Sequence, residues 1–418
     1  MERAEWRTVP IRELYEELYD GPHATPKPSP SGPVFLGIKN VTDDGRLDLS
    51  EIRHIDEDDY PTWTRRVEPR AGDLVFTYEA TLNRYAIIPE EFRGCLGRRM
   101  ALIRPDPTKV DVRFLLYYFF TDSWRAVIRN NMLTGATVDR IPLTNFPEFP
   151  VRTPPLPIQR RIAGILSAYD ELIKNNQRRI RILEEMARAL YHEWFVHFRF
   201  PGHDKLPRAA SALGDIPQGW EVVPFTGIAD VLSGGTPRTH VGEYWNGEIP
   251  FFTPRDAPAY FYVQDTEKHV TELGLSKCAS ELYPPDTVFI TARGTVGKVA
   301  LPSVPMAMNQ SCYALRGKTG IPQRFLFLMT LQQVDYLKTN TGGATFDTIV
   351  VDTFRRMRVV KPVSEILARF AHHTDAIFEQ VKTLQRQVQN LRWTRDLLLP
   401  RLLSGGVKLN ETDPRKTS

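Results

Sequence analysis

Two long segments of the chain carry a heptad pattern, which restricts each of them to a long helix. In both segments, mostly apolar positions recur at alternating steps of three and four residues, giving a mean period of 3.5. The seam positions are Ile162, Leu166, Tyr169, Ile173, Asn176, Ile180, Leu183 and Leu190 in the first segment, and Leu367, Phe370, Ile377, Val381, Leu384, Val388 and Leu391 in the second. Apart from Gly164 in the first turn, neither seam is interrupted by glycine or proline. Each segment therefore predicts a helix of roughly 35 residues, about 50 Å long.

Two packing arrangements are open to these helices. Each could cover only the globular region beside it, or the two could pack on each other. Four to five heptads are more than most globular helices need, which favours mutual packing. Asn176, a polar residue at a seam position, would then fix the register of the pair. The residues between the seam positions, among them Glu184 and Gln385, are typical of a solvated face.

A repeated heptapeptide indicates that the chain is built twice on one plan. GATVDRI at 135–141 returns as GATFDTI at 343–349. Each copy follows a strand entry and an apolar helical stretch, and each precedes a short strand and a Pro-rich hinge. The strand entries and helical stretches lie at 71–80 and 112–120 in the first half, and at 284–293 and 322–337 in the second. We therefore predict an α+β chain of two similar mixed α/β units, each followed by a long helix.

The length of 418 residues is too great for one ordinary core, so at least two domains are expected. We divide the chain into a first domain (1–155), a central helix (156–200), a second domain (201–361), a C-terminal helix (362–404) and a tail (405–418).

The composition is that of a globular protein, with 42% hydrophobic and 25% charged residues. No apolar run approaches the roughly 18 residues that a membrane span needs, and the N-terminus lacks the apolar region of a signal peptide. Cys95, Cys278 and Cys312 are widely spaced, which fits a reducing cytoplasm. The net charge of +4 permits nucleic-acid binding but does not by itself argue for it.

Sequence patterns for catalysis are missing. GKT at 317–319 lacks the upstream glycine of a phosphate-binding loop, because Cys312 stands at that position. SGGTP (233–237) and ARGTVGK (292–298) do not follow the dinucleotide-binding pattern and are more typical of tight turns. The adjacent His372 and His373 would not face one site on a helix. We predict no catalytic residue and no metal site, and favour a binding protein over an enzyme.

Loops in both halves offer basic and amide side chains beside small residues. Such side chains can bind phosphates or form paired hydrogen bonds to guanine and adenine. The predicted contact residues are Lys39, Asn40, Tyr78, Arg84 and Thr137 in the first half, and Arg255, Arg293, Lys298, Asn309 and Gln310 in the second. Each loop alone is more often an ordinary surface loop. Their presence in similar positions of both halves favours a protein that binds one long ligand through two similar domains.

Five stretches together resemble the specificity subunit of type I restriction-modification systems. They are DGPHATPKPS (20–29), the central helix from PPLPIQRR to HEWF (154–195), LSGGTPRTHVGEYWNGEIPFF (232–252), ARGTVGK (292–298) and LLLPRLLSG (397–405). The resemblance covers nearly the whole chain. The central helix and the C-terminal LLPRLLSG pattern are its most specific parts.

The resemblance implies a non-catalytic subunit with two target-recognition domains related by a pseudo-twofold axis. Each domain would read one half of a bipartite, asymmetric DNA site, and the two long helices would pair antiparallel to set the gap. The chain would bind two methyltransferase subunits and the restriction (motor) subunits. S-adenosylmethionine, ATP and Mg²⁺ would be used by those partners, with no cofactor bound by this chain.

Two other functions stay open from the residues. The paired helices could belong to a non-enzymatic scaffold whose two domains bind proteins. The chain could also be a complete enzyme whose motif is not recognisable in the sequence.

Overall fold

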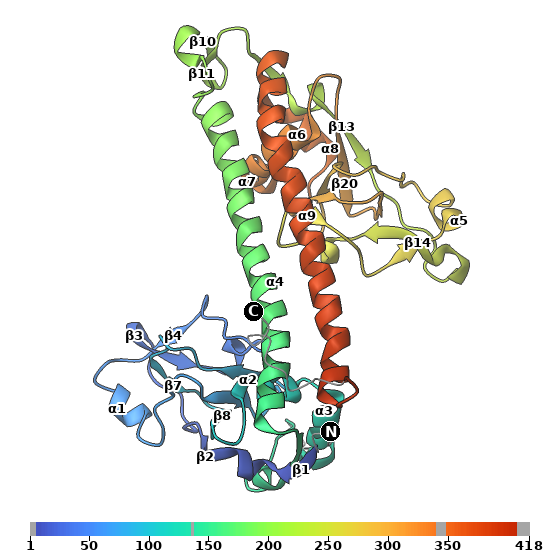
Figure 1. The fold of residues 1–418 in the computed structure, drawn as a ribbon. Coiled ribbons are helices and arrows are strands. Elements are labelled where there is room, and N and C mark those ends of the chain that lie inside the picture. The colour runs from blue at the N-terminus through green and yellow to red at the C-terminus, as the bar shows by residue number, and fades with distance from the viewer. Residues whose placement is uncertain (1–5, 135–137, 340–347, 408–418) are drawn as a thin grey trace, which may run out of the picture. The chain divides into compact units, whose positions relative to one another are not determined.

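The computed structural model describes residues 6–134, 138–339 and 348–407. It divides the chain into two compact units (Figure 1): unit 1 is Met1–Glu171 with Leu391–Ser418, and unit 2 is Leu172–Asn390. Residues 135–137 of the first copy of the heptapeptide and residues 343–347 of the second lie outside the described residues. Within the described ranges, no helix combines the length and the apolar character needed to cross a membrane.

The described part of unit 1 contains nine strands in three small sheets. Their bounds are β1 Arg7–Pro10, β2 Tyr15–Asp20, β3 Ser29–Leu36, β4 Arg53–His54, β5 Leu74–Thr77, β6 Tyr85–Ile87, β7 Gly94–Leu96, β8 Met100–Pro105 and β9 Pro150–Thr153. One sheet has the order β2-β8-β5-β6, and a second has β3 between β4 and β7. β1 pairs antiparallel with β9, so the first and last strands of the domain close on each other.

Unit 2 repeats this arrangement. Its strands are β10 Arg208–Ser211, β11 Gly214–Pro217, β12 Glu221–Pro224, β13 Ala229–Ser233, β14 Trp245–Phe252, β15 Tyr262–Val263, β16 His269–Val270, β17 Val288–Thr291, β18 Val299–Pro302, β19 Ala307–Met308, β20 Cys312–Gly317 and β21 Arg358–Lys361. The order β13-β20-β17-β18 matches β2-β8-β5-β6, and β15 extends this sheet at its edge. β14 lies between β16 and β19 as β3 lies between β4 and β7. The relative direction of the paired strands is also the same, because β3–β7 and β14–β19 are both parallel pairs. The predicted internal repeat is confirmed.

Short helices complete each unit. α2 (Val112–Phe119) and α3 (Asp122–Asn131) of unit 1 correspond to α6 (Gln323–Gln332) and α7 (Val334–Thr339) of unit 2. Asp111 begins α2 because its carboxylate accepts hydrogen bonds from two amides of the first turn. The remaining short helical segments are α1 Tyr60–Trp63, α5 Glu272–Ser276 and α8 Val351–Arg356, with single turns η1 Ile11–Leu14, η2 Ile38–Asn40, η3 Phe146–Glu148, η5 His203–Lys205, η6 Phe225–Gly227, η7 Gly242–Tyr244 and η8 Pro254–Asp256.

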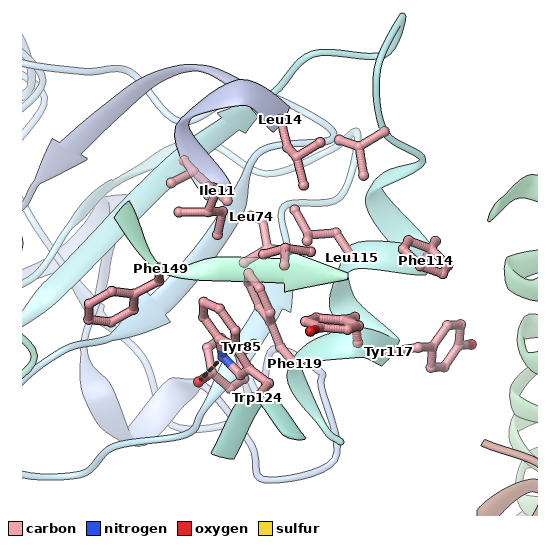
Figure 2. Packing of buried hydrophobic residues seen from close by; sticks show 14 of the residues in the cluster. Ile11, Leu14, Leu74, Tyr85, Phe114, Leu115, Tyr117, Phe119, Trp124 and Phe149 are labelled. Carbon is pink, nitrogen blue, oxygen red and sulfur yellow. Dashed lines mark hydrogen bonds between the residues drawn. The ribbon is translucent and has the colours of Figure 1, made fainter. Parts of the chain in front are cut away.

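An aromatic core fills unit 1 between its sheet and helices (Figure 2). The Trp124 ring stacks on that of Phe119 with centroids 4.5 Å apart, and its Nε1 donates to the Tyr85 hydroxyl at 2.9 Å. All three side chains are buried. The same cluster includes Ile162 and Leu166 from the start of one long helix and Leu402 and Leu403 from the end of the other. The first domain is therefore packed against both long helices through one continuous core.

The two long helices are α4 (Leu156–Tyr191), continued by a π-helical turn at His192–Val196, and α9 (Ser364–Leu403). In unit 1, Asp170 of α4 accepts a hydrogen bond from Arg395 of α9 at 2.6 Å. In unit 2, Asn176 Nδ2 donates to Gln387 Oε1 at 3.4 Å, and the rings of Tyr191 and Phe370 pack together. In these contacts the residue numbers rise along α4 and fall along α9, so the two helices run antiparallel.

Most of the predicted seam is buried where it was expected. The buried positions are Ile162, Leu166, Ile173, Asn176, Ile180, Leu367, Phe370, Val381, Leu384 and Val388, and the half-buried positions are Tyr169, Leu183, Leu190, Ile377 and Leu391. Beside Ile377, the buried Phe378 stacks on Phe261 of the second domain. The predicted packing of the two helices on each other is therefore confirmed, and the helices also pack on the domains.

The predicted solvated face is wrong at two positions. Glu184 of α4 and Gln385 of α9 are 2% and 7% exposed. Glu184 Oε1 accepts from the backbone N–H of Phe261 at 2.6 Å, and Gln385 Nε2 donates to the carbonyl of Tyr262 at 3.1 Å. One polar side chain from each helix thus satisfies the backbone at the start of β15, an edge strand whose backbone groups would otherwise lack partners.

Candidate nucleic-acid interface

Loops at the ends of three strands of unit 2 enclose a pocket of about 540 Å³. The pocket brings together Arg255 after β14, Arg293 after β17, and Asn309 after β19. These are three of the five contact residues predicted in this half of the chain. Lys268, which the sequence reasoning did not select, also lines the pocket, and its ammonium lies 5.8 Å from the centre of the Trp245 ring. These three cationic side chains share the concave surface with the carboxylates of Asp256 and Glu267. The cationic groups are suited to phosphate or to a guanine edge.

The backbone around this pocket is held by local hydrogen bonds. Asp256 Oδ2 accepts from the backbone N–H and the hydroxyl of Thr253, at 2.8 and 2.6 Å, which fixes the turn that carries Arg255. Asn309 Oδ1 accepts from the backbone N–H of Ser311 at 3.0 Å. Gly294, with φ at 77°, follows Arg293 and allows a left-handed backbone there. Arg255 and Arg293 are themselves exposed, so turns held by hydrogen bonds present cationic side chains to solvent.

The other two predicted residues of unit 2 lie beside the pocket rather than in its lining. Lys298 is exposed and precedes β18, where its backbone N–H donates to the Thr291 hydroxyl at 2.9 Å. Gln310 is also exposed, and its Oε1 accepts from the hydroxyl of Thr236 in the SGGTP loop. Gln310 therefore joins this loop to the turn that carries Asn309.

The predicted contact residues of unit 1 range from exposed to buried. Lys39 is exposed on η2, and half-buried Arg84 donates to the carbonyl of Val41 at 3.2 Å. Asn40 is buried, and its side chain hydrogen-bonds the backbone of Gly37, Asp48 and Glu51.

Tyr78 is only 3% exposed, and its burial raises the pKa of its hydroxyl. Asn40 and Tyr78 are thus placed to support loops, since neither offers much surface to a ligand, and Thr137 lies outside the described residues.

Unit 1 has a second pocket, of about 340 Å³, formed by the DGPHATPKPS loop and the region of α1. Asp20 forms an ion pair with Arg66 at 2.6 Å and lies within hydrogen-bond distance, 3.1 Å, of His23 Nε2. Arg65, which also lines this pocket, adds a further cationic group. The sequence motif marked this loop by its resemblance, but Arg65 and Arg66 carried no pattern of their own.

No group of three or more His, Cys, Asp or Glu side chains able to hold a metal ion is found in the described parts of the chain.

Comparison with known proteins gives the same assignment for both units. The family model described as "Type I restriction modification DNA specificity domain" matches residues 65–185 and 217–390. The chain is 32% identical over 157 residues to the specificity subunit of the type I restriction enzyme MjaIX of Methanocaldococcus jannaschii, a stretch of 37% of this chain and 36% of that relative. It is 24% identical over 409 residues to the HindI specificity subunit of Haemophilus influenzae, covering 81% of this chain and 87% of that relative.

A solved structure supports the fold. The S subunit of a type I restriction-modification system from M. genitalium matches with a TM-score of 0.62 and 16% identity, over 96% of this chain and 97% of that one. The alternative of an unrelated coiled-coil scaffold is not needed to explain the repeat or the helix pair. The two matched regions cover more than half of the sequence, and this chain therefore belongs to the type I restriction-modification DNA specificity family.

Proposed function

We propose that this chain is the DNA-recognition subunit of a type I restriction-modification complex and reads a bipartite, asymmetric site. The pocket of unit 2 is the observation that carries the proposal, because Arg255, Lys268, Arg293 and Asn309 converge there. The same loops recur in unit 1 with different side chains. One scaffold with two different reading surfaces suits two unlike half-sites on one duplex.

The helix pair would set the number of base pairs between the half-sites. α4 has 36 residues, which gives a length of about 54 Å. Half-sites read from one face of B-DNA lie about one turn, roughly 34 Å, apart. A pair of helices of this length, packed through a buried seam, can hold a fixed distance on that scale, which a flexible linker cannot.

Catalysis would belong to partner subunits in the cytoplasm. We expect two methyltransferase subunits and the restriction subunits to bind this chain and to use S-adenosylmethionine, ATP and Mg²⁺. Exposed apolar side chains one helical turn apart support protein docking on the long helices. They are Trp393 and Leu397 on α9, and Ile182 and Met186 on α4.

The experiment is to coexpress the chain with its methyltransferase and to map methylated adenines across the host genome. The proposal predicts one split motif with a constant gap. Methylation without a motif, or no methylation from an assembled complex, would contradict it. The isolated chain with S-adenosylmethionine should methylate nothing; activity there would favour a complete enzyme.

A further inference from the structure

Equivalent backbone hydrogen bonds align the loops after β5 and β7 of unit 1 with the loops after β17 and β19 of unit 2, residue by residue. After β5, the N–H of Tyr78 donates to the carbonyl of Arg99; after β17, the N–H of Ala292 donates to that of Ser311. The repeat continues to the final isoleucine that both copies of the heptapeptide share. The backbone N–H of Ile141 donates to the carbonyl of Tyr78. In unit 2, the backbone N–H of Ile349 donates to the carbonyl of Ala292 in the same way.

This alignment places Glu79 where unit 2 has Arg293, and Arg99 where unit 2 has Ser311. The turn after β7 extends the correspondence, since Gly97 donates to the carbonyl of Leu36 as Asn309 does to that of Phe252. Lys39 of η2 and Arg255 of η8 keep the same charge. Where the pocket of unit 2 has Arg293, unit 1 therefore has a carboxylate with an arginine beside it.

The two side chains form a half-buried ion pair. Arg99 Nε lies 2.9 Å from Glu79 Oε1, and the side chains are 33% and 19% exposed. This contact leaves Glu79 Oε2 and the terminal NH₂ groups of Arg99 outside the pair.

The backbone holding the pair is unusual. Ala80 and Arg99 have φ angles of 68° and 70°, a left-handed conformation that residues with a side chain seldom adopt. The N–H of Ala80 donates to the carbonyl of Asp139 at 3.0 Å, and Glu79 forms a β-bridge with Arg140, which anchors the loop from a second segment. Strained positions of this kind persist where surrounding contacts enforce them, and they cluster at binding sites.

A carboxylate facing DNA is repelled by phosphates and accepts hydrogen bonds from bases. In the major groove, the exocyclic amino group of cytosine is the donor best matched to a glutamate, because adenine presents the N7 acceptor beside its amino group. Arg99 lies beside Glu79 and balances its charge. We propose that Glu79, oriented by Arg99, reads the N4 amino group of a cytosine in the half-site recognised by unit 1. This inference rests on the proposed function.

The test is Glu79→Gln in the chain coexpressed with its methyltransferase, with adenine methylation mapped across the genome. Glutamine both donates and accepts, which matches the N6 and N7 atoms of adenine. One cytosine position of one half-site should become adenine-tolerant, with a change in preference of about tenfold or more. The other half-site and the gap should stay unchanged. An unaltered motif from an active Glu79→Gln complex would overturn the inference.

Matched variants separate this role from a structural one. Glu91→Gln removes the same charge from an exposed residue of the same domain and should leave the motif intact. Arg99→Ser installs the residue of unit 2 and should relax the same position as Glu79→Gln. A lower yield with an unchanged motif would show that Arg99 only supports the fold.

Substitution of Arg293 should relax the sequence preference only in the half-site that unit 2 binds. The remaining half-site is then the one that unit 1 binds. If the wild-type complex shows no split motif, the proposed function fails. If it shows one and Glu79→Gln leaves it unaltered, only the cytosine assignment fails.

Discussion

Glu184 is expected to make the stability of unit 2 depend on pH. Its carboxylate is 3% exposed, and burial raises its pKa to about 7 despite the hydrogen bond from Phe261 and the ion pair with Arg188 at 3.3 Å. An unfolded glutamate titrates near 4.5. The folded state therefore binds the proton more tightly, and stability falls as pH rises from about 4.5 through about 7. A gap of about 2.5 pKa units corresponds to roughly 3 kcal/mol of stability lost above pH 7.

Glu184→Gln removes this titration and keeps an acceptor for the Phe261 amide. We expect the free energy of unfolding of the variant, relative to wild type, to increase by roughly 3 kcal/mol between pH 4.5 and pH 8. Urea unfolding of the full chain at several pH values measures this. Glu185→Gln, one residue along on the exposed face of α4, is the control. A difference between wild type and Glu184→Gln that is independent of pH would refute the reasoning, as would an equal effect of Glu185→Gln.

Two further substitutions test the core and the interface. Trp124→Ala removes a fully buried side chain and its hydrogen bond to Tyr85. It should lower the free energy of unfolding, measured with urea, by about 3–5 kcal/mol. A loss below about 1 kcal/mol would mean that the core is loosely packed around Trp124. Arg293→Ala should weaken binding of the assembled complex to its own site by about 1–3 kcal/mol in fluorescence anisotropy, and an unchanged affinity would remove Arg293 from the interface.

The repeat and the helix pair could be predicted because their signals are local and periodic. The strand entries became β5 and β17, and the heptad positions became the buried seam, since burial on one face imposes a spacing that the sequence displays. Glycine and small residues mark the turns that carry Arg255, Arg293 and Asn309; these residues line one pocket, and their contact with DNA stays a prediction.

The errors fall where a residue's role depends on a distant segment. Glu184 and Gln385 fit a solvated face by heptad position, yet β15 approaches that face and buries them. Asn40 stays a predicted contact residue, although its amide hydrogen-bonds the backbone of its own loop. Lys268 was missed because nothing near it in sequence indicates that its loop folds over the pocket.

The helix pair as a spacer is the central claim, and shortening it tests that claim most directly. Deleting one heptad from α4 (173–179), together with the facing heptad of α9 (384–390), preserves the seam and shortens the pair by about 10 Å. Methylation mapping of the coexpressed complex should show both half-sites unchanged and a gap shorter by at most about three base pairs. An unchanged gap in an active complex, or an altered half-site sequence, would contradict the account.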